Sequence, residues 1–256
     1  MSSDAHPDGE QAADEAPADA LTPPAASDVL GQALGGAARR AGFDPQQDAT
    51  TGEVVWRAIG GPRGIAESLL PTLLFVVSYI VSGNNLILAI ALSVGAAVVL
   101  TVIRLAARQP FGSAVGGLIG ALIAAGWALV TGSAVDAFLW GLILNAVYGG
   151  GLLLSALVGW PIIGLAGGFL MGEGVAWRRD RRKRRAYFWL TIMWAALFAV
   201  RLAVQLPYYF SGDVAGLGTW KLLLGIPPFA VLVAVTWIVV RRVNPRRAVS
   251  DSGAEA

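Results

Sequence analysis

Six apolar runs, each close to the length of a membrane-crossing helix, occupy most of the chain between residues 65 and 240. They span residues 65–81, 86–103, 111–130, 138–158, 187–206 and 222–240. A helix needs about 20 mostly apolar residues to cross a bilayer, whereas the helices of a small soluble fold need a polar face that these runs lack. The predicted fold class is therefore an all-α membrane protein with six transmembrane helices.

Basic residues predict how these helices are oriented. All but two of the 19 Lys and Arg residues fall on one side of the membrane if the chain crosses six times; the exceptions are Arg201 and Lys221, and Lys221 is assigned to the last outer loop. The outer connections 82–85 and 131–137 contain neither Lys nor Arg. Because cytoplasmic loops hold the excess of Lys and Arg, we expect a multi-pass protein of the bacterial inner membrane with both termini in the cytoplasm.

Residues 1–52 are predicted to be a disordered acidic tail. Asp and Glu far outnumber the two basic residues there, Arg39 and Arg40, and the first 26 residues have no apolar run of the kind that a secretory signal needs. A weak helical pattern at 27–43 fits an interfacial helix or a transient one. A short helix is predicted at 53–59, at the start of the six-span domain (53–242), and residues 243–256 form a cytoplasmic tail.

The composition excludes several kinds of chemistry. The chain has no cysteine, and its one histidine, His6, lies in the acidic tail, so disulfides, thiolate catalysis and Cys- or His-based metal sites in the membrane core are excluded. No Walker loop, Rossmann fingerprint, HExxH motif or nucleophile elbow is present. We therefore predict no catalytic residue, no metal and no cofactor, and expect that the protein is not an enzyme. The arginines lie beside apolar runs, which favours the membrane surface over nucleic acid.

The interval 161–177, PIIGLAGGFLMGEGVAW, is too short and too rich in glycine for a seventh crossing. A further crossing would also move the basic residues that follow to the other side of the membrane. We predict a re-entrant or interfacial segment on the cytoplasmic side.

Small residues recur at helical spacing in two places, Gly112–Gly116–Gly120 and Gly164–Gly168–Gly172. Such ridges let helices approach closely in lipid. We expect them to serve packing within the chain, and a homodimer face is the alternative.

Arg201 is the basic residue that falls inside a predicted span. A charge at a helix centre costs about 2.5–3.5 kcal/mol on insertion scales, so it usually faces a partner or a cavity. A structural interpretation has its side chain reach the outer headgroups or pair with Asp136 or Asp213. The functional alternative is a polar pocket formed by Arg201, Gln205, Asn145 and Tyr148.

Two acidic residues near the predicted cytoplasmic surface have structural and functional interpretations. Glu67 lies one helical turn after Arg63, a spacing that favours a surface ion pair. Glu173 lies between two glycines in the 161–177 interval, where a solvated acid is expected and a binding or gating role is the alternative.

A basic cluster, RRDRRKRR, separates the fourth and fifth spans. Basic residues near a membrane attract anionic lipid headgroups by about 1 kcal/mol each, and they also fix topology. The predicted anionic-lipid contacts are Arg178, Arg179, Arg181, Arg182, Lys183, Arg184 and Arg185.

Several blocks of sequence resemble a family of actinobacterial membrane proteins of unknown function. They are GGPRG from Gly60, LLPTLLFVVSY from Leu69, RQP from Arg108, WGLILNAVYG from Trp140, GEGVAWRRD from Gly172 and RLAVQLPYY from Arg201. A more distant likeness is to the bacterial septation protein A family, through the Leu-Pro opening at Leu70, Pro161-Ile-Ile, Trp194-Ala and Trp220-Lys. That family is linked to cell-envelope maintenance and division through protein contacts.

The likeness to septation protein A favours a non-catalytic scaffold or partner of other membrane proteins in cell-envelope organisation. The alternative is a small transporter or lipid-handling protein with a polar pocket around Arg201. The expected partners are membrane lipids and other membrane proteins or a second copy of the chain, and nucleic acid is not expected.

Overall fold

The computed structural model of the protein describes residues 50–107 and 111–244, and within these ranges it contains helices and no β-strand. Most of the predicted acidic tail (1–52), including the 27–43 pattern, and most of the predicted C-terminal tail (243–256) lie outside the described residues. The described part of the acidic tail already begins α2 at Thr51, and α10 ends at Val243. The α-helices are α2 Thr51–Ala58, α3 Gly61–Val81, α4 Leu86–Ala106, α5 Phe111–Thr131, α6 Leu139–Leu157, α7 Ile162–Leu170, α8 Arg181–Phe210, α9 Val214–Leu223 and α10 Ile226–Val243. Two 3₁₀-helices, η2 Ala134–Phe138 and η3 Ala176–Arg179, precede α6 and α8.

Five stretches of the described chain are long and apolar enough to cross a membrane: Gly64–Val81, Leu86–Ala106, Ala134–Leu157, Arg181–Phe210 and Val214–Val243. The predicted all-helical class is therefore confirmed for the described residues, and these five stretches are consistent with the predicted multi-pass membrane protein. The third predicted span, 111–130, forms α5, of which Val115–Thr131 counts as a shorter apolar helix. A sixth crossing, by α5, stays a prediction.

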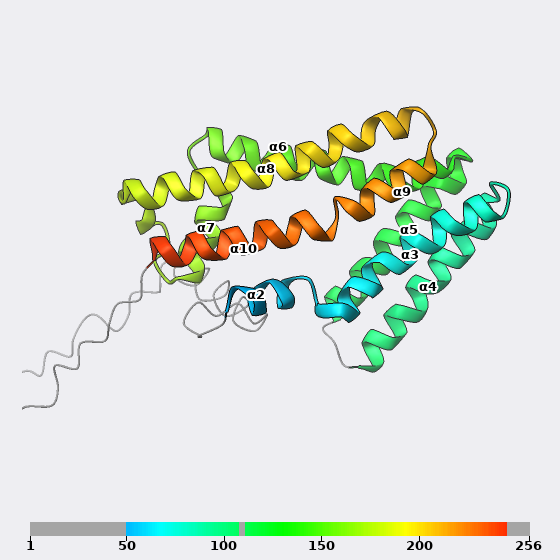
Figure 1. Cartoon of the computed structure of the whole chain (residues 1–256), viewed down its shortest axis with the longest axis horizontal. Helices are drawn as coiled ribbons and strands as arrows, with labels where there is room; N and C mark the ends of the chain where they lie inside the picture. The colour runs from blue at the N-terminus through cyan, green and yellow to red at the C-terminus, as the bar shows by residue number, and fades with distance from the viewer. Residues whose placement is uncertain (1–49, 108–110, 245–256) are drawn as a thin grey trace, which may run out of the picture.

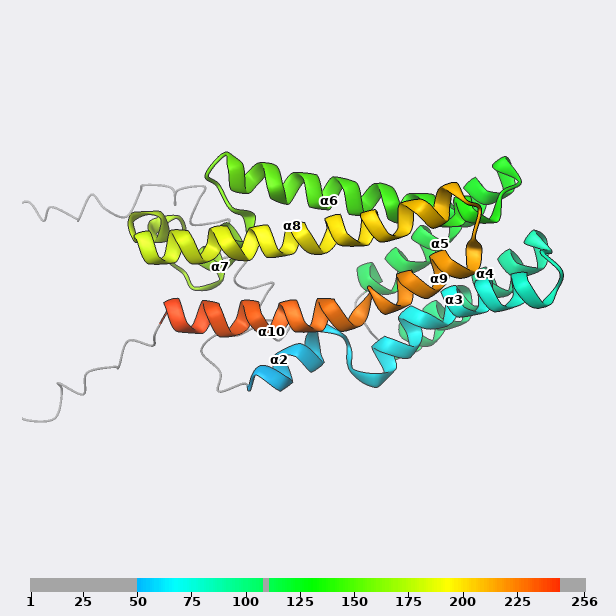
Figure 2. The same ribbon diagram turned by 45° about the horizontal axis from the view of Figure 1, so that its top comes forward.

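The helices form two groups that α9 connects (Figures 1 and 2). In the first group α6 and α8 lie side by side, and α10 packs against α8. In the second group α3 packs against α4, and α4 packs against α5. Helix α9 contacts α8 on one side and α3 and η2 on the other, so its residues border both groups.

Helices α4 and α9 begin at sequences with strong turn and capping signals. The connection between α3 and α4 contains Gly83 and Asn84, both with positive φ, and the Asn85 side chain then accepts from the Leu88 N–H to cap α4. At the start of α9, the Asp213 carboxylate accepts from the Gly216 N–H in the same way. Polar caps therefore fix the ends of α4 and α9, which both line the cavity described below.

The predicted short helix at 53–59 is present as α2. Its N-terminus is closed by a capping box in which the side chains of Thr50 and Glu53 each accept from the other residue's backbone N–H. Val54 is buried against Trp237 of α10. Helix α2 is therefore packed against the membrane domain.

The 161–177 interval forms α7 and η3, which both pack against α8 (Figure 1). Gly164 and Gly168 lie against the ring of Trp177, which is itself buried with Tyr187, Leu190 and two residues of α10. Gly164 and Gly168 therefore pack within the chain, as expected, whereas Gly172 follows the end of α7 with positive φ and an added Cβ there has no heavy atom within 4 Å. In the other ridge, an added Cβ at Gly116 or Gly120 has no heavy atom within 4 Å.

Candidate functional site

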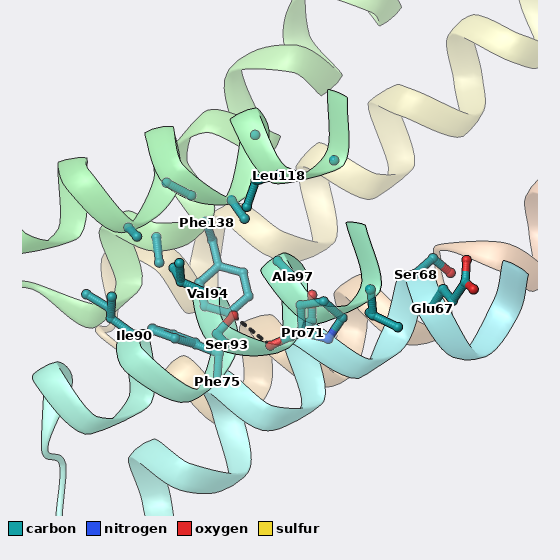
Figure 3. Close-up of a pocket in the computed structure, with 18 of the residues that line it drawn as sticks. Glu67, Ser68, Pro71, Phe75, Ile90, Ser93, Val94, Ala97, Leu118 and Phe138 are labelled. Carbon is teal, nitrogen blue, oxygen red and sulfur yellow. Dashed lines mark hydrogen bonds between the residues drawn. The ribbon is translucent and has the colours of Figure 1, made fainter. Parts of the chain in front are cut away.

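A cavity of about 410 Å³ lies between α3, α4 and α5, and η2 and α9 contribute to its wall (Figure 3). Helix α3 supplies Glu67, Ser68, Pro71, Thr72 and Phe75, and α4 supplies Ile90, Ser93, Val94, Ala97, Leu100 and Arg104. Helix α5 supplies Gly117, Leu118, Gly120, Ala121, Ala124 and Ala125, and the wall is completed by Ala137, Phe138 and Lys221. On α3 and α4 these positions recur mainly every three or four residues, so each helix presents one face to the cavity.

The cavity exists because its α5 wall is made almost entirely of glycine and alanine. Close packing normally fills the space between helices with side chains, but Gly117 and Gly120 contribute none and three alanines contribute one methyl group each. The result is a mostly apolar chamber within the range of volumes of ligand pockets in proteins, about 300–1,000 Å³.

An ion pair lies in the wall. The Arg104 Nε donates to the Glu67 carboxylate at 2.7 Å, and the two side chains are 24% and 8% exposed. Figure 3 shows Glu67 and Ser68 together, apart from Ile90 and Phe75 at the opposite side of the cavity. Glu67 therefore joins α3 to α4. The side chain of Arg63 lies outside the described set, so the predicted ion pair between Arg63 and Glu67 stays a prediction.

Pro71 adds polarity to the same wall. Proline has no N–H, so the Glu67 carbonyl one turn earlier lacks its usual helical donor. The Ser93 hydroxyl of α4 donates to the Pro71 carbonyl at 2.9 Å (Figure 3). This contact and the Glu67–Arg104 ion pair hold α3 and α4 together along the cavity.

Lys221, in the last turn of α9, adds a cation to the cavity. Its side chain is exposed, because it borders the open space of the cavity. The Lys221 Nζ lies 5.1 Å from the centre of the Phe138 ring, and Phe138 packs edge-on against Phe75 at 5.8 Å. Among residues 50–107 and 111–244, the Phe138 ring accompanies this ammonium group and no carboxylate forms a salt bridge with it.

Arg201 binds the break between α9 and α10. Its Nε and Nη2 donate to the carbonyl oxygens of Leu224 and Gly225, both at 2.6 Å. Two prolines follow the break, and Pro228 has no N–H for the Leu224 carbonyl. The guanidinium group therefore supplies donors that the interrupted helix lacks. This is a structural role, although its partners are backbone carbonyls and not the predicted Asp136 or Asp213.

The other predicted pocket residues lie near Arg201 without lining the 410 Å³ cavity. Phe198 lies between Arg201 and Tyr148, 5.8 Å from the guanidinium carbon and 5.7 Å from the tyrosine ring. Gln205 is 5% exposed, Asn145 is half-buried on α6, and Tyr148 is 53% exposed. A polar pocket around Arg201 stays a prediction.

The predicted outer acids make other contacts. Asp136 accepts from the Tyr209 hydroxyl at 2.5 Å, and Asp213 caps α9. The structure therefore pairs neither Asp136 nor Asp213 with Arg201.

The basic cluster divides into groups with different contacts. Arg178 stacks on Trp160 at 3.7 Å, and Lys183 donates to both carboxylate oxygens of Glu173 at 2.7 Å. Arg179 and Arg182 are exposed. The remaining three arginines, Arg181, Arg184 and Arg185, line a second cavity.

Neither the cavity nor a role for Lys221 was predicted from the sequence. The last predicted span begins at residue 222, which placed Lys221 in an outer loop, whereas α9 already begins at Val214. The Gly- and Ala-rich α5 was the available signal for missing side-chain volume, but sequence alone does not show which helices surround it.

The sequence matches the family described as "Protein of unknown function (DUF3159)" over residues 59–247. No curated protein and no solved structure matches the chain. The predicted resemblance to a family of unknown function is therefore confirmed, whereas the actinobacterial origin of that family and the likeness to septation protein A stay predictions.

Proposed function

The chain belongs to the family described as "Protein of unknown function (DUF3159)", and from that premise we propose a small transporter or lipid-handling protein that holds an amphiphilic anion in the cavity between α3, α4 and α5. This proposal keeps the transporter or lipid-handling class named from the sequence and moves its site from Arg201 to the cavity beside Lys221. It assigns no catalytic role to the described residues.

The observation that carries the proposal is the unpaired charge of Lys221 in a mostly apolar chamber. Glu67 and Arg104 balance each other, whereas the described residues give Lys221 no carboxylate. An ionisable group at membrane depth is costly and commonly marks a path for a substrate or ion. An anionic group beside Lys221, with an apolar body against the α5 wall, satisfies both the charge and the lining.

The break after α9 supports a transport-type site. Transporters commonly bind substrates where membrane helices are discontinuous. Lys221 lies in the last turn of α9, and Arg201 holds the carbonyls that follow this turn. Arg201 is thus a positioning residue for the helix end that carries Lys221.

The proposed topology has six crossings, with α5 as the third, and both termini in the cytoplasm of a bacterial plasma membrane. Basic residues at the end of α4, in η3 and at the end of α10 support it: Arg104, Arg178, Arg179, Arg241 and Arg242. In this topology α7 lies on the cytoplasmic side.

The competing prediction is a scaffold role in envelope organisation. Its partners would be lipids, other membrane proteins or a second copy of the chain.

The experiment uses the absence of native cysteine. Thr72→Cys places one thiol in the cavity wall, and its labelling by a small neutral maleimide is measured in membranes. We expect octyl sulfonate below its micellar concentration to slow labelling about tenfold when present at about ten times its Kd, because bound anion blocks the thiol. Octyl trimethylammonium is expected to give no comparable protection.

Two glycine variants on α5 give a matched control. Gly120 lines the cavity and Gly116, one turn earlier, does not, and a Cβ meets no atom within 4 Å at either position. Gly120→Leu should abolish protection, and Gly116→Leu should preserve it. Equal protection by both amphiphiles, or equal loss in both variants, contradicts the proposal and leaves the scaffold prediction as the one to pursue.

A further inference from the structure

A second cavity, of about 580 Å³, lies between the end of α6 and the start of α8. Its lining consists of Ala156, Gly159, Pro161, Arg181, Arg184, Arg185 and Phe188. Three of the seven lining residues are therefore arginines, and the others are apolar or glycine.

The first two turns of α8 present two different faces. Lys183, Tyr187 and Leu190 form one face, which is tied to Glu173 and packed against η3 and α10. The cavity face consists of Arg181, Arg184, Arg185 and Phe188, at the i, i+3, i+4 and i+7 positions that share one side of a helix. The arginines are thus gathered by the packing of the opposite face.

No carboxylate neutralises the cavity arginines within the part of the chain that the structure describes. Glu173 pairs with Lys183, and Asp180 caps α8 by accepting from the N–H groups of Arg182 and Lys183. Arg181, Arg184 and Arg185 are exposed to the open space. Planar guanidinium groups bind phosphate oxygens in a bidentate manner.

The surroundings of the cavity match the level of lipid headgroups. Trp160 lies between the lining residues Gly159 and Pro161, and Trp189 directly follows Phe188; both tryptophans are exposed. Tryptophan concentrates at membrane–water interfaces. Phe188 and Ala156 add apolar wall beside the arginines, which suits the glycerol and upper acyl part of a lipid.

We propose that this cavity binds the phosphate group of an anionic phospholipid through Arg181, Arg184 and Arg185. Basic pockets between membrane helices on the cytoplasmic side are suited to such headgroups. A free phosphate shares the headgroup's chemistry, so the experiment must separate the two sources. The site is independent of the cavity beside Lys221.

The test compares two double variants that lose the same charge from the same segment. Arg184→Gln with Arg185→Gln removes cavity arginines, whereas Arg179→Gln with Arg182→Gln removes exposed arginines that do not line the cavity. Binding of phosphatidylglycerol to each detergent-solubilised protein is measured by native mass spectrometry, with phosphatidylcholine and inorganic phosphate as the other probes.

We expect the cavity variant to bind phosphatidylglycerol about tenfold to thirtyfold more weakly than wild type, and the surface variant to stay within about threefold. Binding of inorganic phosphate with the same dependence on the variants supports the phosphate site and identifies a soluble source. Equal losses in both variants, or equal affinity for phosphatidylcholine, overturn the proposal.

A measurement on the wild-type protein covers the case in which the cavity variant does not fold. A phosphatidylglycerol carrying a photoreactive group near its headgroup is cross-linked in membranes, and the adducts are mapped by peptide. Adducts in 156–161 and 181–188 support the site, and adducts confined to other segments overturn it.

Discussion

The Arg201→Leu variant is expected to be less stable than wild type by about 3 kcal/mol or more, since a hydrogen bond to a charged group contributes about 1.5–3 kcal/mol. Arg201 makes two such bonds, to the carbonyls of Leu224 and Gly225. Leucine leaves both without this donor at a helix break surrounded by apolar groups. Removing the charged side chain from the span gives no compensating gain in folding stability. The span stays in the micelle in both the folded and the unfolded state, so the cost of inserting an arginine is the same in both.

The measurement is thermal unfolding of the detergent-solubilised proteins. Arg201→Lys keeps the charge but replaces two fixed donors with one flexible ammonium group. The stability of this lysine variant should therefore lie between that of the leucine variant and that of wild type. Protection of Thr72→Cys by octyl sulfonate should also fall, because α9 and Lys221 lose their anchor. A leucine variant that melts at the same temperature as wild type would contradict this structural role of Arg201.

The Gly168→Ala variant is expected to lose about 3 kcal/mol of stability through overpacking. A Cβ at Gly168 would clash with the Gly174 carbonyl oxygen and would lie 2.5 Å from Trp177 Cδ1. Neither atom is the end of a flexible side chain, because one is backbone and the other belongs to a buried ring. Helix α7 must therefore move away from η3, which disturbs the cluster of Trp177 and Tyr187.

Gly151→Ala in α6 is the matched control. A Cβ there meets no heavy atom within 4 Å, so the substitution should stabilise the helix by up to about 1 kcal/mol. Both variants are compared with wild type by thermal unfolding. Equal behaviour of the two would show that the close packing of α7 on η3 does not hold in solution.

The membrane class could be predicted from sequence because the apolar runs exceed anything a soluble fold of this size requires. The helix at 53–59 was also predictable, from Gly60, Gly61 and Pro62 at its end, and the capping box places its start at Thr51. Helix α9 begins at Val214, before the last predicted span begins at residue 222, and its small and polar residues have a weaker apolar signal in the sequence than the segment after Pro228.

The candidate site was harder to predict because it depends on which helix faces meet. The sequence indicated a local partner for Glu67, Arg63, but it gave no sign that the Glu67 carboxylate contacts Arg104 on another helix. The composition of α5 shows that side-chain volume is missing, but only the packing of α3 and α4 shows where. In the basic cluster, sequence predicted the anionic-lipid contact for seven residues, and the two faces of α8 separate the three that line a cavity.

The most direct test of the central claim is the charge preference of the cavity beside Lys221. Thr72→Cys is labelled in membranes by two small methanethiosulfonate reagents of similar size, one carrying a sulfonate and the other a quaternary ammonium group. The account predicts faster labelling by the anionic reagent, a preference that Lys221→Arg retains and Lys221→Met removes. Faster labelling by the cationic reagent, or a preference that Lys221→Met leaves unchanged, would contradict an anion-binding cavity.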